Sequence, residues 1–523
     1  MKALITMEPR QTTPAQRRLT DGLRQLRTLQ QAGRRVYQSA DFTRLQREAL
    51  ETAGFLQRGV KGWYLASRPG QSTGDSTAWN ASFADFVGGY CDARFGEQWC
   101  VAPRISLLLH TGASVLPRDM VVHAAAAGNH RLELPAGCSL YDARLANRLE
   151  DREPVRIGSL RALTLAETLV RLVESDFEHR PTDIQIALQQ LPDASDLNRL
   201  LLEGSQPVVA GRLAGALRAA HRPVLADDVR DTMRAVGHTV VETNPFTQSL
   251  PVFGSGIIPS PYVPRLGLMW HAMRPAVEAR VPTMSAGLVD VERVLEAVDE
   301  AYPADAYHSL SIEGYQVTEE LIARVANNDW NPDDNPQDAE SRNAMAARGY
   351  FLAHQAVRAS LRRILSGEDA ATVVDADHGG WYRQLFTPSV TAGLLKASDL
   401  AGYRNAPVYI KNAAHVPPPF SAAREMMPAL FTLLAAEPHA AVRAVLGHFA
   451  FVFIHPYMDG NGRMARFLLN AMLVAGGFPW TIIPVARRDE YMAALDAASA
   501  RDDIAPFAQF IVSCIGVPQA PQA

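Results

Sequence analysis

The chain has 523 residues, of which 47% are hydrophobic and 20% charged, with a formal net charge of −4 and a pI near 6.4. This length allows roughly two to four domains, each able to bury a core, and the balanced charge gives no global electrostatic argument for nucleic-acid binding. The longest apolar runs, such as Phe449–Ile454, fall far short of the ~20 residues of a membrane span, so no membrane partner is expected.

The cysteines indicate a reducing compartment. They form no C-x-x-C pair, and the N-terminus (MKALITMEPRQ) carries no secretory signal. We therefore expect buried free thiols in a cytoplasmic protein. The four cysteines are Cys91, Cys100, Cys138 and Cys514.

Two helices and a hairpin are the first predicted elements. Leucines recur at helical spacing over Arg17–Leu29, and Ser39–Asp41 offers an N-cap for a second helix that reaches Leu50 or Ala53. Residues 55–66 (FLQRGVKGWYLA) then predict two short strands around a tight turn. Helices followed by a small hairpin are the order of a winged helix, the DNA-binding variant of the helix-turn-helix.

Basic residues outnumber acidic ones in this predicted winged-helix domain, residues 15–68. A basic patch is the electrostatic footprint of phosphate binding, so DNA is its expected partner. The alternatives are a winged helix that contacts protein, or a helical bundle whose arginines are only solvated. The residues counted are Arg17, Arg18, Arg24, Arg27, Arg34, Arg35, Arg44, Arg47, Arg58 and Lys61 against Asp21, Asp41, Glu48 and Glu51.

Residues 79–240 predict a mixed α+β domain, with short strands at Trp99–Leu109 and Met120–His123. With the preceding domain and its wing sequence GWYLA, this stretch resembles the AbiEi-type antitoxins of bacterial toxin–antitoxin systems. The resemblance implies an antitoxin-like region that binds DNA or senses a signal. The predicted helices are Leu160–Glu174, Thr182–Leu191 and Val208–Ala219.

A linker is predicted over 241–264, because the segment NPFTQSLPVFGSGIIPSPYVP is rich in proline, glycine and serine. Helical patterns resume at Val289–Ala301 and at Asn343–Leu365. Between them lies the sequence SLSIEG. On a helix its Ser309 and Glu313 share one face, one turn apart, so the serine can brace the carboxylate.

Residues 403–419 predict an extended hairpin with a proline-rich exit. His354 is expected to be a packed or exposed histidine rather than a ligand, because no metal-binding spacing accompanies it. His448, seven residues before His455, is expected to be a packing residue of its helix rather than a second base.

The densest group of polar residues is the segment HPYMDGNGRMAR, residues 455–466, between two apolar helical patterns. Pro456 ends the first helix and leaves His455 at that end. The turn Gly460-Asn461-Gly462 begins the second helix, where backbone N–H groups and the positive end of the helix dipole suit an anion such as a diphosphate.

The side chains of this segment suit nucleotide chemistry. Asp459 offers the single carboxylate that, with phosphate oxygens, usually holds magnesium. Arg463 and Arg466 lie on one helix face and carry guanidinium forks for phosphate, and His455, with a pKa near neutrality, can take a proton from an attacking hydroxyl. Each residue alone has a structural alternative as a cap, a turn or a solvated arginine. Together they predict transfer of part of a nucleotide to an alcohol.

The segment resembles the signature of Fic-domain proteins, H-P-F-x-D/E-G-N-G-R-x-x-R, with Tyr457 in place of phenylalanine as the one departure. The resemblance extends over roughly residues 260–515. It implies an all-helical Fic core, here 265–515, in a multidomain and mainly α chain whose winged-helix and α+β regions come first. It also implies transfer of AMP from ATP to a protein hydroxyl, with release of pyrophosphate.

By this resemblance, His455 is the general base and Asp459 the Mg2+ ligand. The phosphates are held by the glycine turn, and the leaving phosphates by Arg463. Arg466 is implied to hold the γ-phosphate. The residues of the turn are Gly460, Asn461 and Gly462.

The same resemblance assigns two further segments. Ser309, Glu313 and Gly314 fit the family's inhibitory sequence, S/T-x-x-x-E-G/N, whose glutamate competes with the γ-phosphate for Arg466. The hairpin fits the family's flap, which holds a target by strand addition. Arg404, Val408 and Ile410 match the flap pattern.

Two functions follow. The first is a self-inhibited protein adenylyltransferase that uses ATP and Mg2+ to modify a Ser, Thr or Tyr hydroxyl of a protein target, with itself as a further target. Removal of AMP and transfer of another nucleotide stay open, because the motif fixes neither direction nor base. The second is a DNA-binding regulator of toxin–antitoxin type whose Fic domain binds nucleotide but is idle.

Overall fold

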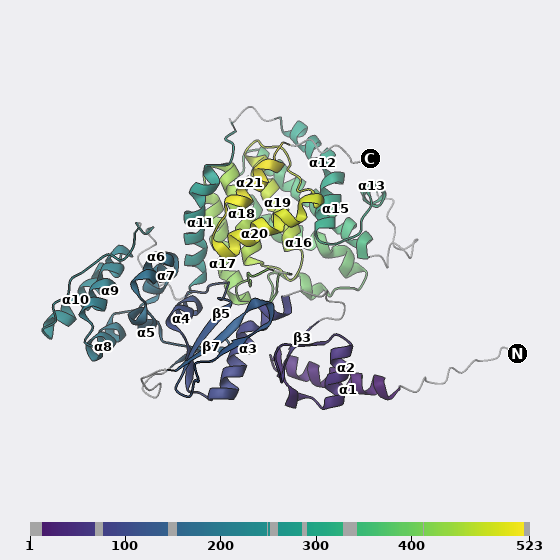
Figure 1. Cartoon of the computed structure of the whole chain (residues 1–523). Coiled ribbons are helices and arrows are strands. Elements are labelled where there is room, and N and C mark those ends of the chain that lie inside the picture. The colour runs from purple at the N-terminus through teal and green to yellow at the C-terminus, as the bar shows by residue number, and fades with distance from the viewer. Residues whose placement is uncertain are drawn as a thin grey trace.

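The computed structural model describes residues 13–67, 77–144, 154–247, 249–251, 260–284, 290–327, 342–411 and 413–516. Over these residues the chain is mainly helical, and its three small sheets all precede residue 163. Figure 1 shows four groups of elements, with the largest helical group above the sheet β4–β7 and a helical arm to one side. Within this part of the chain, no helix combines the length and apolar character of a bilayer span.

The first group joins two helices to a three-stranded antiparallel sheet of order β1-β3-β2. Thr13 and Thr43 cap the two helices through capping boxes. The predicted cap at Ser39–Asp41 is wrong, because these residues form a 3-10 turn before the second helix begins. The predicted hairpin is confirmed as β2 and β3. The elements are α1 (Pro14–Gln31), β1 (Val36–Gln38), α2 (Arg44–Thr52), β2 (Leu56–Arg58) and β3 (Trp63–Ala66).

The second group surrounds a four-stranded sheet of order β4-β5-β7-β6, in which β5 and β7 run parallel and the other pairs antiparallel. The strand predicted over Trp99–Leu109 is wrong after Val101, because Pro103 occupies the first turn of a helix, where its missing N–H costs nothing. The elements are α3 (Thr77–Phe95), β4 (Trp99–Val101), α4 (Pro103–His110), β5 (Asp119–Ala124), β6 (Arg131–Glu133), β7 (Ser139–Arg144), β8 (Val155–Ile157) and β9 (Leu160–Ala162).

The third group is a helical arm with its own apolar core. The helix predicted from Leu160 begins only at Leu165, after Thr164 as its cap, because Leu160–Ala162 pair with β8 instead. The other two predicted helices are confirmed as α7 and α9. The elements are α5 (Leu165–Arg171), α6 (Glu174–His179), α7 (Pro181–Gln190), α8 (Ser195–Glu203), α9 (Pro207–Ala219) and α10 (Pro223–Ala235).

The fourth group is all-helical and holds the largest apolar core. Its first helix begins at Tyr262, inside the predicted linker, of which residues 252–259 lie outside the described part. The helix predicted over Val289–Ala301 runs on to Ile312. The elements are α11 (Tyr262–Glu278), α12 (Val291–Ile312), α13 (Glu319–Ala326), α15 (Arg342–Leu365), α16 (Ala370–Thr391), α17 (Phe420–Ala436), α18 (Ala440–Ile454), α19 (Asn461–Ala475), α20 (Arg488–Arg501) and α21 (Ala505–Cys514).

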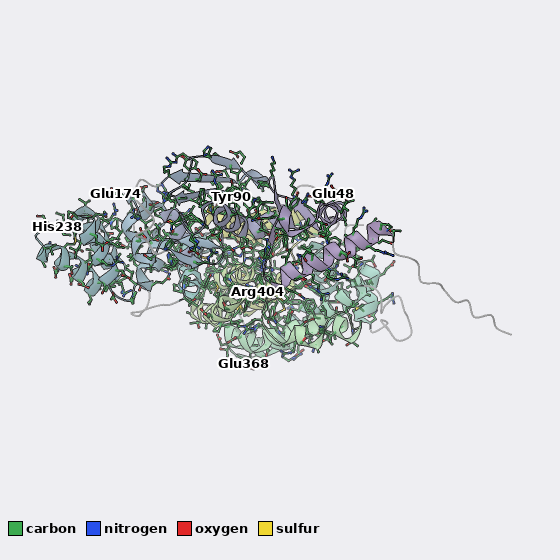
Figure 2. The ribbon with its side chains drawn as sticks, turned by 90° about the horizontal axis from the view of Figure 1, so that it is seen from below. Glu48, Tyr90, Glu174, His238, Glu368 and Arg404 are labelled. Carbon is green, nitrogen blue, oxygen red and sulfur yellow. The ribbon has the colours of Figure 1, made fainter. Side chains whose placement is uncertain are left out.

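A buried arginine joins three of these groups. Arg265 of α11 donates to the Thr111 carbonyl at 2.9 Å and pairs with Asp183 of α7. Seen from below, the labelled residues His238 of the arm and Glu48 of the first group lie toward opposite ends, with Arg404 between them (Figure 2). All four cysteines are buried free thiols, as predicted.

Candidate active site

The end of α18 places His455. This residue has a positive φ of 52°, in the left-handed region that few non-glycine residues adopt. The imidazole Nδ1 lies 3.1 Å from the Val452 carbonyl, an acceptor, so Nδ1 carries the proton and Nε2 keeps its lone pair. Burial, helped by the nearby Arg404 cation, lowers the pKa of His455 to about 4. The sequence expectation of a pKa near neutrality is therefore corrected: the ring is neutral and a proton acceptor at pH 7.

The turn after His455 is held by its own side chains. Asn461 accepts from the Tyr457 N–H at 2.9 Å and donates to the Tyr457 carbonyl at 2.8 Å. The Tyr457 ring is buried and stacks on Tyr382 with 3.8 Å between centroids, so tyrosine fills the place of the expected phenylalanine. Because the Asn461 amide is used in the turn, only the backbone N–H of this residue is left for a phosphate.

The first turn of α19 presents backbone donors. Gly460 is the N-cap, in a left-handed conformation with φ 77°, and the next three N–H groups have no intrahelical acceptor. The Glu313 carboxylate lies against Gly462, where a Cβ would meet it. An anionic group therefore already occupies the start of this helix, as expected of a helix N-terminus.

Glu313 also pairs with Arg466. Arg466 is 3% exposed and its Nη2 donates to Glu313 Oε1 at 2.8 Å. Burial opposes the charge of Glu313, but the attraction of Arg466, with a weaker one from Arg463, outweighs it and lowers the pKa of the carboxyl. Burial also opposes the charge of Arg466, but the Glu313 anion outweighs this effect and raises the pKa of Arg466 above its usual range.

Ser309 holds the arginine rather than the carboxylate. Its hydroxyl accepts from Arg466 Nε at 2.8 Å, and its carbonyl accepts from Nη2 at 3.0 Å. The expectation that Ser309 braces Glu313 is corrected, because Glu313 is the C-cap that follows α12 and reaches the arginine from beyond the helix end. Gly314 follows with φ 86°, which reverses the chain there.

Arg463 is buried between two aromatic rings. Its guanidinium lies 5.3 Å from the Tyr315 ring centroid and 5.1 Å from that of Phe386, and its Nε has no hydrogen-bond partner among the described residues. A buried guanidinium N–H without an acceptor costs free energy unless a ligand supplies one. Sequence reasoning missed both rings: Tyr315 directly follows the E-G pair, whereas Phe386 has no distinguishing signal in its apolar helix.

Asp459 faces solvent beside this arginine. Its side chain is 66% exposed, and Oδ2 lies 3.8 Å from Arg463 Nη2. Its Oδ1 accepts from the Gly460 N–H at 2.6 Å. Within the described residues no three His, Cys, Asp or Glu side chains gather as a metal cluster, so a cation here would need phosphate oxygens as its other ligands.

The loop of residues 403–419 is not the predicted hairpin: none of its described residues belongs to a strand. Three consecutive prolines, 417–419, lack N–H groups for a ladder. Arg404 is 2% exposed and its guanidinium donates to backbone carbonyls, so its expected contact with a docked target is corrected. Val408 and Ile410 are partly exposed, and their target contact stays a prediction.

His354 and His448 are both packing residues, which agrees with the expectations for them. His354 is buried beside Tyr302 and Trp480. His448 is buried with its ring nitrogens at 2.9 Å from the Ala465 carbonyl and 2.8 Å from the Tyr491 hydroxyl.

Residues 381–473 match the model of the Fic/DOC family. The protein adenylyltransferase Fic of Nematostella vectensis is 28% identical over 243 residues, which cover 44% of this chain and 50% of the relative. That of Drosophila grimshawi is 30% identical over 222 residues, 42% of each chain. The chain thus spans about half the length of these curated relatives or less. A solved structure of Fic-1 (residues 134–508) from C. elegans has 18% identity and a TM-score of 0.35, covering 67% of this chain and 94% of that one.

Proposed function

We propose that this protein transfers AMP from ATP to a Ser, Thr or Tyr hydroxyl of a protein target. The single observation that carries the proposal is the Glu313 carboxylate, an anion held at the start of α19 by Arg466. A site that binds a carboxylate with helix N–H groups and a buried guanidinium suits phosphate oxygens. The Fic/DOC match over 381–473 and the adenylyltransferase relatives support the same reaction.

In the proposed reaction, the target hydroxyl oxygen forms a bond to the α-phosphorus while the bond to the pyrophosphate oxygen breaks. Nε2 of His455 takes the hydroxyl proton, because it is neutral and carries a lone pair. Arg463 neutralises charge on the leaving pyrophosphate, the Gly462 N–H donates a hydrogen bond to it, and Arg466 holds the γ-phosphate.

Magnesium fits as a companion of the triphosphate. Asp459 has an exposed carboxylate beside Arg463, and one carboxylate plus phosphate oxygens is a common Mg2+ site. The ion would supply charge neutralisation to the phosphates.

Self-inhibition is part of the proposal. The guanidinium of Arg466 binds Glu313 in the place proposed for the γ-phosphate, so ATP binds fully only when the carboxylate leaves. Ser309 keeps Arg466 in position and Gly314 provides the turn that aims Glu313 back at it.

A DNA-binding role is proposed for residues 15–68. The sheet order β1-β3-β2, with α2 before the β2–β3 wing, is compatible with a winged helix. Arg17, Arg24, Arg44 and Arg58 are exposed on this unit. An antitoxin-like α+β region over 79–240, a connection over 241–264 and a Fic domain over 265–515 complete the proposed organisation. A cytoplasmic location is proposed from the four free thiols.

The test is incorporation of label from α-labelled ATP and magnesium into the protein itself or into lysate proteins. Glu313→Gly should raise incorporation above wild type, and His455→Ala in that background should abolish it. Glu320→Gly, at an exposed glutamate of α13, is the matched control and should leave the rate unchanged. No incorporation, together with sequence-specific DNA retention, would favour an idle Fic domain in a regulator. Loss of AMP from labelled proteins would favour the reverse reaction.

A further inference from the structure

The loop 403–419 is held on one side by the N-terminal half of the chain. Asn80 of α3 donates to the Ala413 carbonyl at 3.1 Å, and the Val416 N–H donates to the Ser114 carbonyl at 2.9 Å. The Arg35 guanidinium lies 5.0 Å from the Tyr409 ring centroid. These contacts come from three separate places: the approach to β1, the start of α3 and the segment after α4. Figure 1 shows α3 and α4 beneath the large helical group.

On its other side, the same loop holds the end of α18. Arg404 Nε donates to the His455 carbonyl at 2.8 Å, and Nη2 donates to the Ile454 carbonyl at 3.4 Å. The Arg404 N–H donates to the Pro456 carbonyl at 2.8 Å, and the His415 ring donates to the Phe453 carbonyl at 2.9 Å. The last carbonyls of a helix have no intrahelical donor, so Arg404 and His415 supply what α18 lacks.

We infer that Arg404 is a positioning residue for His455, and that Arg35, Asn80 and the Ser114 carbonyl position the loop that carries Arg404. The N-terminal half of the chain thereby sets the rate at which His455 accepts a proton. This inference rests on the proposed function, in which His455 is the base.

The geometry supplies the physical reason. The left-handed backbone of His455 is unfavourable for a residue with a Cβ and persists only where its surroundings fix it. Its carbonyl is fixed by Arg404, which also donates to the Pro418 carbonyl at the far end of the loop. When the loop shifts, this carbonyl loses its donor and the imidazole moves. A misplacement of about 1 Å costs on the order of 100-fold in rate.

Arg404 also has an electrostatic effect that a purely structural residue lacks. Four charged or titratable groups face His455. The Arg404 cation lowers the pKa of His455, whereas the carboxylates of Glu313 and Asp459 raise it. The fourth group, His415, is buried and neutral, because burial lowers its own pKa to about 3. Burial lowers the pKa of Arg404 to about 10, so its charge is present at pH 7. Removal of that cation should therefore raise the pKa of His455.

The first experiment uses the full chain with Glu313→Gly and compares Arg35→Ala/Asn80→Ala with Arg27→Ala, an exposed arginine of α1. Amide exchange is followed in peptides spanning 403–419 and 450–456. Removal of the two contacts should speed exchange of the loop, including the Val416 amide, by about tenfold. It should also lower AMP incorporation several-fold and leave the ATP dissociation constant unchanged. Exchange and incorporation equal to those of Arg27→Ala would overturn the inference.

The second experiment changes Arg404 itself and follows the titration of His455 by NMR of histidines labelled at Cε1. Arg404→Met should shift the pKa of His455 upward. Arg404→Lys keeps the charge, so it should show little of this pKa shift and should retain part of the transfer rate. An unchanged titration in Arg404→Met would overturn the positioning role. Failure of Glu313→Gly to incorporate AMP would refute the proposed function instead, since the exchange and titration measurements need no turnover.

Discussion

Loss of the Glu313 carboxylate should tighten binding of ATP far more than binding of AMP. Arg466 is 3% exposed and spends one donor on Glu313, while Nε and Nη2 stay bonded to Ser309. Glu313→Gly therefore frees the guanidinium for the γ-phosphate without releasing it from its place. A hydrogen bond to a charged group contributes about 1.5–3 kcal/mol, and each 1.4 kcal/mol is a factor of ten in affinity.

We therefore expect ATP to bind about 10- to 100-fold more tightly to the variant. Calorimetric titration with a non-transferable ATP analogue and magnesium measures this gain, with Glu320→Gly as the control. AMP lacks the β- and γ-phosphates, so its affinity should change little. Equal gains for AMP and ATP, or no gain for ATP, would refute the assignment of Arg466 to the γ-phosphate. Without nucleotide the variant should melt at lower temperature, because a buried guanidinium is left without its carboxylate.

Three further outcomes test the site. Ser309→Ala in the Glu313→Gly background should weaken ATP binding several-fold, since Arg466 loses an acceptor. If Ser309→Ala in the wild-type background instead tightened ATP binding, the serine would brace the Glu313 carboxylate. Gly462→Ala in the same Glu313→Gly background should weaken ATP binding, measured by calorimetry, at least about tenfold, because a Cβ would fill the space where the carboxylate lies. The control is Gly379→Ala, whose Cβ meets only a side-chain end 3.5 Å away. Because the pKa of His455 is lowered to about 4, the transfer rate should stay level from pH 8 to 6 and fall only toward pH 4; an inflection near pH 6.5 would contradict this. Because of the same lowered pKa, His455 binds a proton below about pH 6.5 in the unfolded chain but not in the folded chain. The contribution of His455 to the free energy of unfolding should therefore decrease as the pH falls from 6.5 to 4.

The local structure of residues 455–466 could be predicted because its signals are local. Pro456 ends one helix and Gly460 begins the next, and the polar residues lie in the turn between them and in the first two turns of α19. Even here, the sequence could not indicate how Asn461 is used. Its amide is spent on the Tyr457 backbone, which depends on the side-chain conformation rather than on the residue type.

Contacts between distant residues were harder to predict. The pattern S-x-x-x-E indicated a helix face on which serine and glutamate meet, but Glu313 lies just beyond the last helical turn and Ser309 turns to Arg466. Arg404 matches the flap pattern, yet its guanidinium donates to the last carbonyls of α18, about fifty residues further along the chain. A helix end that needs donors is visible in a sequence; the residue that supplies them is not.

In the N-terminal half, two of the errors share one cause. Trp99–Leu109 and Leu160–Glu174 are apolar stretches in which a short strand and a helix follow each other directly. Apolar composition alone does not separate the two. Pro103 and Thr164 mark the two changes, as a residue of the first helical turn and as an N-cap.

The proposed self-inhibition agrees with how deeply Arg466, the proposed γ-phosphate ligand, is buried. Arg466 is 3% exposed, and removal of the carboxylate from a buried ion pair costs about 3–5 kcal/mol. Burial shields Arg466 from water, and Glu313 supplies an anion to it from the end of α12. Because its side chain is 28% exposed and lies beyond the last helical turn, the carboxylate can leave without unfolding that helix. In the proposed function, the burial that would make Arg466 a strong phosphate ligand also favours an internal anion, so Glu313 and the γ-phosphate would exclude each other at this guanidinium.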